Sequence, residues 1–139
     1  MNITGDTSEA SVFSKGCPSR RVLLDVTGRW GILVLAALHQ GESRFGVLRR
    51  HIEGISEKML SHTLQLLRRD GLVLRHVDDS TPPRVTYALT ALGRTVAVPA
   101  VELVTLLEGR VEQFERARDA YEECTPCADA HLGSVGRPA

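Results

Sequence analysis

Aromatic residues and surplus charge are both scarce in this chain of 139 residues. Phe, Trp and Tyr make up 4% of it, and 17 Lys and Arg offset 17 Asp and Glu. No apolar run approaches the roughly 20 residues that span a bilayer, and the N-terminus lacks the charged-then-apolar pattern of a signal peptide. We therefore expect a cytoplasmic protein with no membrane partner, whose 42% apolar residues suffice for one core.

The motifs of the common enzyme classes are also missing. The chain contains no nucleophile elbow around a serine, no phosphate-binding P-loop and no dinucleotide fingerprint. Its five histidines are scattered, without an Asp or Glu at the spacing that would complete a metal or acid–base site. We predict that the protein is not an enzyme and that it has no catalytic residue, no cofactor and no metal.

The most informative stretch of the chain predicts one short helix with two opposed faces. Ser56 suits the N-cap position and Gly71 a left-handed stop, so the helix is expected over 57–70. At about 100° per residue, one face is apolar and contains Leu60, Leu64 and Leu67. The opposite face is a polar ridge without a carboxylate, formed by Lys58, Ser61, His62, Gln65 and Arg69.

Such a ridge suits a DNA groove, because Lys and Arg neutralise phosphates while Ser, His and Gln reach base edges. The alternative is a solvated surface helix that happens to lack acids. The sequence that follows favours DNA binding: residues 72–77 and 85–89 predict two strands, and the intervening residues 78–84 are rich in Asp, Ser and Pro. A helix followed by a hairpin with a proline-bearing tip is typical of the winged helix-turn-helix. Arg75 and Arg84 flank this predicted wing.

Charge is distributed unevenly although the net charge is zero. Between Arg44 and Arg84, eight Lys and Arg outnumber five Asp and Glu. Between Val101 and Cys127, seven acidic residues outnumber three Arg. The basic half therefore coincides with the elements predicted to contact DNA.

The upstream residues complete the predicted helix-turn-helix. A first helix should begin at Pro18 and turn three side chains inward, namely Val22, Leu23 and Val26. The apolar run 30–38 predicts a buried central helix, with Trp30 in the core or in a dimer contact. Residues 43–45 can form a short strand, followed by the first helix of the helix-turn-helix and a turn at 53–55.

Several short motifs occur in order along the chain. They are Cys17-Pro18, Gly28-Arg29-Trp30, Arg44-Phe45, Gly54-Ile55-Ser56-x-Lys58-Met59-Leu60, Asp70-Gly71-Leu72-Val73, Pro82-Pro83-Arg84-Val85-x-Tyr87-x-Leu89-Thr90 and Leu92-Gly93-Arg94. Together, over about residues 17–123, the chain resembles the HxlR-type winged helix-turn-helix regulators of bacteria, relatives of the MarR group. The resemblance implies a homodimeric transcription factor, each subunit of which offers its recognition helix to one half of a palindromic operator.

The expected fold is mainly α with a small β-hairpin, a winged helix-turn-helix with a C-terminal dimerisation helix. One departure from the family is the run from His62 to Gln65, where such helices often carry more basic residues. Affinity should therefore depend more on the wing and on Lys58, Arg68 and Arg69. The candidate DNA-binding residues are Arg44, Ser56, Lys58, Ser61, His62, Gln65, Arg68, Arg69, Arg75 and Arg84.

The C-terminal part predicts a dimer interface. Thr90 can cap a helix from Ala91, and Pro99 should bend or restart that helix. Beyond it, apolar residues recur every three or four positions, a stripe longer than a small winged core can cover. Its members are Ala100, Leu103, Val104, Leu107, Val111, Phe114 and Tyr121. We expect an N-terminal arm over 1–16, the winged domain with its dimerisation helices over 17–123, and a tail over 124–139.

Cys17 is the candidate regulatory residue. It directly precedes a predicted helix start and lies near Arg20 and Arg21, and both features stabilise a thiolate, which is the oxidisable form of cysteine. The resemblance supports this role, since the family includes redox and electrophile sensors with a cysteine at this place. The alternative is an inert thiol that packs as a small apolar side chain.

The pair Cys124 and Cys127, with His131 nearby, leaves three interpretations open. It can be part of a metal site that lacks a ligand, a redox dithiol, or an unstructured pair that is sometimes oxidised, which we favour. For the whole protein, the expected partners are double-stranded DNA, a second copy and an oxidant or small-molecule effector. The alternatives to oxidant control of a DNA-binding regulator are an effector pocket at the dimer interface and a dimeric adaptor that does not bind DNA.

Overall fold

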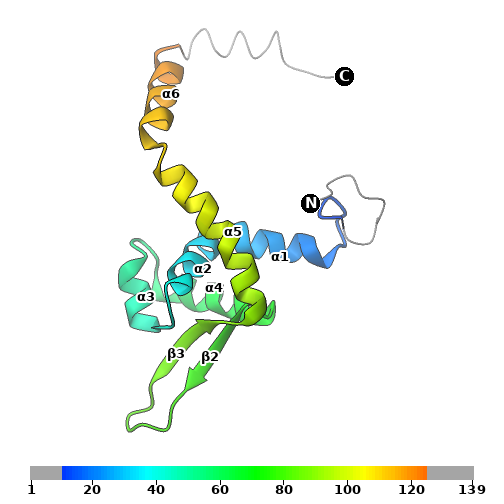
Figure 1. The fold of residues 1–139 in the computed structure, drawn as a ribbon, viewed down its shortest axis with the longest axis vertical. Helices are drawn as coiled ribbons and strands as arrows, with labels where there is room; N and C mark the ends of the chain where they lie inside the picture. The colour runs from blue at the N-terminus through cyan, green and yellow to red at the C-terminus, as the bar shows by residue number, and fades with distance from the viewer. Residues whose placement is uncertain (1–10, 125–139) are drawn as a thin grey trace. The chain divides into compact units, whose positions relative to one another are not determined.

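The computed structural model of the chain describes residues 11–124 (Figure 1). The chain consists of two compact units, and the boundary between them follows Glu102. The elements are α1 (Pro18–Thr27), α2 (Gly31–His39), β1 (Ser43–Arg44), α3 (Phe45–His51), α4 (Glu57–Arg69), β2 (Val73–Val77), β3 (Val85–Leu89), α5 (Ala91–Glu108) and α6 (Val111–Glu123). Within residues 11–124, no single helix is long and apolar enough to cross a membrane, and only α1 and α2 taken together, with a 76° bend, meet that test.

Helix α2 is the centre of the first unit, as predicted from its apolar run. Val34 and Leu35 are fully buried, and Leu38 is nearly so. They share one core cluster with Leu60 and Leu64 of α4. Burying each side chain of this size contributes about 1.5–3 kcal/mol. The helix that carries the polar ridge is therefore held by its apolar face against the middle of the core.

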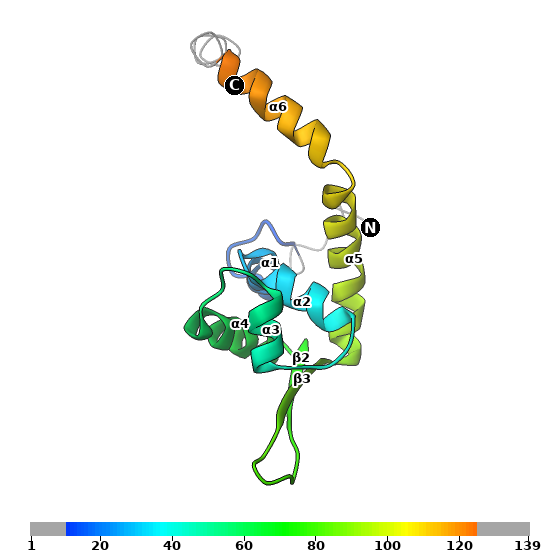
Figure 2. The same cartoon turned by 90° about the vertical axis from the view of Figure 1, so that its left-hand side faces the viewer.

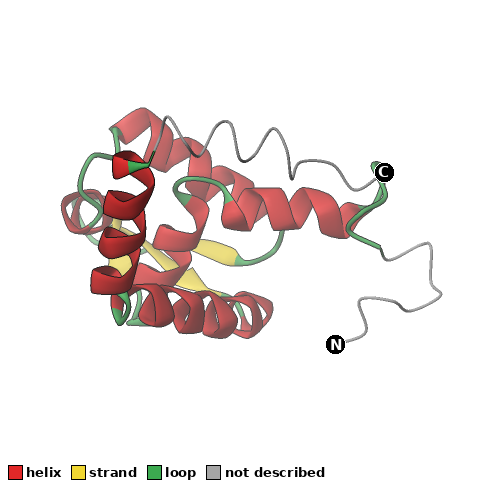
Figure 3. Cartoon of the chain, turned by 90° about the horizontal axis from the view of Figure 1, so that it is seen from above, coloured by secondary structure: helices red, strands yellow, loops and turns green. Residues whose placement is uncertain are grey.

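A three-stranded antiparallel sheet completes the first unit, in the order β1-β3-β2. Ser43 pairs with Tyr87 across β1 and β3, and Val73 pairs with Leu89 across β2 and β3. The sheet is small beside the helices (Figure 3), and the β2–β3 hairpin extends away from them as a wing (Figure 2). The fold is a mainly α winged helix-turn-helix, as the sequence predicts.

Helix α5 begins against the base of the hairpin. The Thr90 hydroxyl accepts a hydrogen bond from the Gly93 N–H at 2.8 Å, which confirms the predicted cap, and donates to the Gly71 carbonyl at 2.6 Å. A Cβ atom on Gly93 would lie 1.9 Å from the Leu72 carbonyl oxygen. Only glycine allows this close approach of α5 to the start of the wing.

Gly93→Ala should therefore lower the free energy of unfolding by about 1–3 kcal/mol, because the methyl group meets backbone that cannot rotate away. Gly46→Ala is the matched control, since a Cβ there would have its nearest neighbour at 3.7 Å, the end of the Arg50 side chain. That change should stabilise α3 by up to about 1 kcal/mol. Urea unfolding of the two variants measures both effects, and equal stabilities would contradict the close packing at Gly93.

Two predictions about the helices are wrong. Leu23 was expected to point inward with Val22 and Val26, but it is 42% exposed. Helix α1 contacts the core along the narrow stripe of Val22 and Val26, which are four residues apart and therefore lie on one face. Leu23 is one position, about 100°, away from Val22 and leaves that stripe.

The C-terminal helix is also interrupted at a different residue from the one predicted. The chain does not restart at Pro99: α5 continues through this residue and ends at Glu108, and α6 begins at Val111. A proline removes one backbone hydrogen bond and otherwise keeps a helical φ angle. The break lies instead at Gly109, directly after the end of α5, where the Arg110 N–H bonds to the Leu107 carbonyl at 3.1 Å in a tighter turn.

Candidate nucleic-acid interface

Helix α4 has the caps that the sequence predicts. The Ser56 hydroxyl accepts a hydrogen bond from the Met59 N–H at 3.1 Å at the N-terminus. At the other end Asp70 is the C-cap, and Gly71 has a φ of +79°, the left-handed conformation that glycine adopts without strain. Both ends are therefore fixed locally, and tertiary packing only has to orient the helix.

The two faces of α4 are confirmed. Leu60, Leu64 and Leu67 are at most 1% exposed. Thr63, a polar residue that the pattern of leucines does not include, is buried as well, and its hydroxyl donates to the Met59 carbonyl at 2.7 Å. The polar ridge faces solvent along its whole length, and all its members are exposed: Lys58, Ser61, His62, Gln65 and Arg69.

The turn before α4 is tight, with Gly54 at a φ of +87°. It joins α3 to α4 and so completes the helix-turn-helix. Arg49 of α3 lies 3.8 Å from Glu57 at the start of α4, and both side chains are largely exposed. Such a surface pair contributes at most about 1 kcal/mol, so it links the two helices without holding them. The carboxylate of Glu57 lies outside the ridge.

Arg68 and Arg75 come together although they belong to different elements. With Ser61 and Gln65 of α4, they line a hollow of about 290 Å³ between this helix and the sheet, with Tyr87 on the same wall. All of these except Tyr87 are predicted DNA-binding residues. The helix and the base of the wing therefore form one polar surface with two guanidinium groups.

The wing itself is ordered by one carboxylate. Asp78 Oδ1 accepts hydrogen bonds from the backbone N–H groups of Ser80 and Arg84, each at 3.0 Å, and from the Ser80 hydroxyl. The Ser80 hydroxyl bond and the two backbone bonds lower the pKa of Asp78 to about 2. Because the carboxylate bonds to both sides of the turn, the backbone of Arg84 is fixed at the tip of the wing. The Arg84 side chain is exposed.

Arg44 and Arg69 occupy places that the sequence could not specify. Arg44 is exposed on β1, at the opposite edge of the sheet from β2. Arg69 is exposed on the ridge, and its Nη2 also lies 3.9 Å from Asp25 Oδ2 of α1. Sequence spacing gives no signal for this contact, because the two residues are far apart in the chain.

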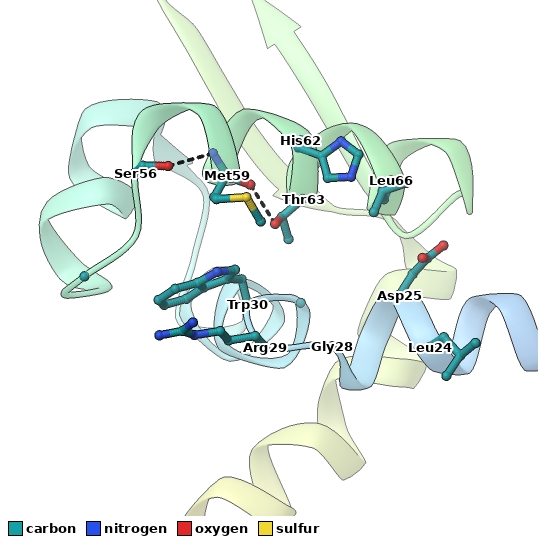
Figure 4. Close-up of a pocket in the computed structure, with 12 residues that line it drawn as sticks. Leu24, Asp25, Gly28, Arg29, Trp30, Ser56, Met59, His62, Thr63 and Leu66 are labelled. Carbon is teal, nitrogen blue, oxygen red and sulfur yellow. Dashed lines mark hydrogen bonds between the residues drawn. The ribbon is translucent and has the colours of Figure 1, made fainter.

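An apolar hollow of about 460 Å³ flanks α4 on the side of the α1–α2 corner (Figure 4). Trp30, Met59 and Leu66 contribute apolar walls, and His62 lies at the same hollow. Trp30 packs partly against the core, as expected, and the Arg29 guanidinium lies 4.8 Å from the centre of its ring. His62 is therefore shared between the polar ridge and this hollow.

Cys17 lies at the predicted helix start, as the N-cap of α1, and is 7% exposed. The Ser19 hydroxyl lies 2.8 Å from its sulfur, and this hydrogen bond lowers the pKa of the thiol, against the opposing effect of burial. Cys17 lines a separate hollow of about 470 Å³ together with Lys15, Arg20 and Arg21. Cys124 ends α6 and is exposed, while Cys127 and His131 lie outside the described residues.

This combination of a capped polar helix, a tight turn and a wing has known counterparts. A family model described as HxlR-like helix-turn-helix matches residues 25–115, well over half of the chain. The chain belongs to the HxlR-like helix-turn-helix family. The resemblance stated from the sequence is thereby confirmed.

Individual relatives of this HxlR-like chain are also described as regulators. The HTH-type transcriptional regulator YtfH of Escherichia coli (strain K12) is 41% identical over 119 residues, 86% of this chain and 94% of the relative. A solved structure of the transcriptional regulator YtfH from Salmonella typhimurium is 43% identical, with a TM-score of 0.74, and the match covers 80% of this chain and 99% of that one. The redox regulator HypR in its oxidized form is 32% identical, with a TM-score of 0.62, over 67% of this chain and 96% of that one. By family, the HxlR-like chain is a DNA-binding transcriptional regulator.

Proposed function

We propose that this HxlR-like protein binds a palindromic operator as a homodimer, with one α4 in the major groove of each half-site. The observation that carries the proposal is the solvent-exposed ridge of α4, which has no acidic side chain and continues into the wing through Arg68 and Arg75. The proposed contacts are Arg44, Ser56, Lys58, Ser61, His62, Gln65, Arg68, Arg69, Arg75 and Arg84.

These residues have two kinds of role. Ser61, His62 and Gln65 have the donors and acceptors that read base edges in a major groove. The Lys and Arg side chains neutralise phosphates, which gives affinity without sequence preference. The Ser56 oxygen already accepts the Met59 N–H, so its hydroxyl hydrogen is left to donate to a phosphate oxygen.

The second unit supports the homodimer. Six large apolar side chains between Leu103 and Tyr121 are between 44% and 53% exposed. They are Leu103, Leu106, Leu107, Val111, Phe114 and Tyr121. An apolar surface of this extent marks a site of association with another protein surface. A second copy of the chain is the proposed cover, because a two-fold axis pairs such a face with itself.

Control by an oxidant or electrophile at Cys17 is the second part of the proposal. The lowered pKa of the thiol and the basic side chains around it favour the thiolate. HypR, a relative in fold and sequence, is a redox regulator. Oxidation or an adduct at this helix start would add bulk or a covalent link where α1 begins.

We also infer that the protein is not an enzyme and that it acts in the cytoplasm. The relatives of this chain are transcriptional regulators, and a bacterial regulator meets its operator in that compartment. We propose the same domain limits as from the sequence, namely an arm over 1–16, the winged domain over 17–123 and a tail over 124–139.

The salt dependence of DNA binding tests the phosphate contacts. Lys58→Gln should weaken binding to every duplex about equally and reduce the slope of log K against log salt by about one unit. Lys15→Gln is the matched control, because Lys15 is the other lysine of the chain and lies beside Cys17 rather than on the ridge. A wild-type protein without affinity for any duplex at low salt would instead favour the dimeric adaptor.

A further inference from the structure

A carboxyl pair joins α1 to the C-terminal end of α4. Asp25 belongs to α1 and Asp70 caps α4, and Figure 4 shows the Asp25 side chain directed toward α4. Asp25 Oδ2 and both carboxylate oxygens of Asp70 are shielded from water. None of the three has a hydrogen-bond donor among the described residues when both side chains are ionised. Buried oxygens of this kind cost free energy unless a donor reaches them.

A proton between the two carboxyl groups supplies that donor. Burial raises the pKa of Asp70 above its ordinary value, and the hydrogen bond to Asp25 and the repulsion by its charge raise it further. The negative end of the α4 dipole acts in the same direction. Arg21 and Arg69 oppose the shift, but Arg69 stays 3.9 Å from Asp25 and is largely exposed, so it only partly compensates the charge.

Of the two helices that carry the pair, α4 is the one expected to move when the charge of the pair changes. The Asp25 backbone is held in place, because a Cβ on Gly31 would lie only 2.1 Å from the Asp25 carbonyl oxygen. Helix α2 packs against both α1 and α4 and has no charged side chain before His39. Arg21 of α1 and Arg69 of α4 are the cations that act on Asp70. Asp25 also shares one hollow with Arg29 and His62 and a second hollow with Lys15 and Arg20. A second negative charge at the pair pushes on the end of α4.

We propose that Asp25 and Asp70 are positioning residues that hold α4 through one shared proton, and that loss of this proton weakens DNA binding. In the bound form the Asp70 carboxyl O–H donates to the Asp25 carboxylate. When the proton leaves, two carboxylates face each other and the end of α4 moves away from α1. The proposal rests on the proposed function in one respect only, namely that α4 carries the DNA contacts.

The direction of the pH dependence follows from the raised pKa. The folded chain keeps a proton on Asp70 at pH values where the unfolded chain has lost it. The stabilisation is complete below the ordinary aspartate pKa and is lost as the pH rises through the raised value. The affinity for DNA should fall in the same interval, in addition to any contribution from the histidines.

Asp70→Asn tests the proposal, because the amide donates to Asp25 at every pH. Thermal melting and binding to one fixed duplex are measured from about pH 4, near the ordinary aspartate pKa, up to about pH 8. At the upper end the variant should melt roughly 4 °C above the wild type and bind at least about fivefold more tightly, and both differences should shrink toward the lower end. Asp25→Asn should behave alike, because it removes the charge that repels Asp70 and its amide can donate to the Asp70 carboxylate.

Asp79→Asn is the control for a simple change of charge, because Asp79 is exposed on the wing. A pH-dependent difference of the same size in this variant would overturn the proposal. So would an Asp70→Asn protein that melts below the wild type, or at a constant offset across the pH range. If the pH-dependent melting difference is seen but the wild type binds no duplex, the effect on DNA binding and the proposed function are both contradicted. A melting difference that is constant across the pH range contradicts only the shared proton of the carboxyl pair.

Discussion

Leu107→Glu should convert the protein to a monomer that no longer binds a full palindrome tightly. Leu107 lies among the exposed apolar side chains of the second unit and is itself 45% exposed. A carboxylate at this place would have to be buried without a partner when two copies meet, which is more costly than the apolar contact it replaces. Joining two half-site contacts in one dimer raises affinity by about 10²–10⁴, and the variant should lose that factor.

Sedimentation and binding to whole and half operators measure the two consequences. Thr105→Glu is the matched control, since it adds the same charge about 160° away on the same helix and should remain a dimer. Circular dichroism confirms that the helices persist in both proteins. A tight dimer of the Leu107→Glu protein would place the interface elsewhere in the molecule.

Cys17→Ser should abolish release from the operator by peroxide or a quinone. In the wild type, oxidation or an adduct at the start of α1 would shift this helix, which packs against α4. The two recognition helices of a dimer must match one turn of DNA, about 34 Å, so a small rotation loses contacts at both half-sites. A coupling of about 1–3 kcal/mol corresponds to a 5–150-fold loss of affinity.

Binding with and without oxidant is compared for the wild type, Cys17→Ser and a Cys124→Ser control. The control should respond as the wild type does. Equal release of all three proteins would make Cys17 a structural thiol and point to Cys127. If no protein responds, the protein is not controlled by oxidation, and either a small molecule at the dimer interface controls it or it has no effector.

The helix-turn-helix could be predicted from the sequence because its signals lie in short, continuous stretches of the chain. Ser56 and Gly71 set the ends of α4 to within one residue, and the leucines four residues apart set its buried face. The turn-forming residues between the two strands likewise defined the wing. Of the two effects predicted for Pro99, a bend or a restart, the restart was wrong, because a proline costs a helix one hydrogen bond while continued packing can outweigh that cost.

The remaining features depend on contacts between distant segments. The proximity of Asp25 to Asp70 and Arg69 requires α1 to lie across the end of α4, and the spacing of the three residues contains no trace of it. The hollow beside Trp30 and the burial of Thr63 have the same origin. Sequence spacing defined the ridge, while only the folded chain shows what flanks it.

Selection of bound duplexes from a random pool tests whether the ridge of α4 reads the operator. The wild type should enrich one palindromic sequence, and a protein with both His62→Ala and Gln65→Ala should enrich a different or a relaxed one while it still binds DNA. Lys58→Gln should keep the wild-type preference at lower affinity, because phosphate contacts have no sequence preference. The same preferred sequence from the wild type and the double variant would contradict base reading by α4.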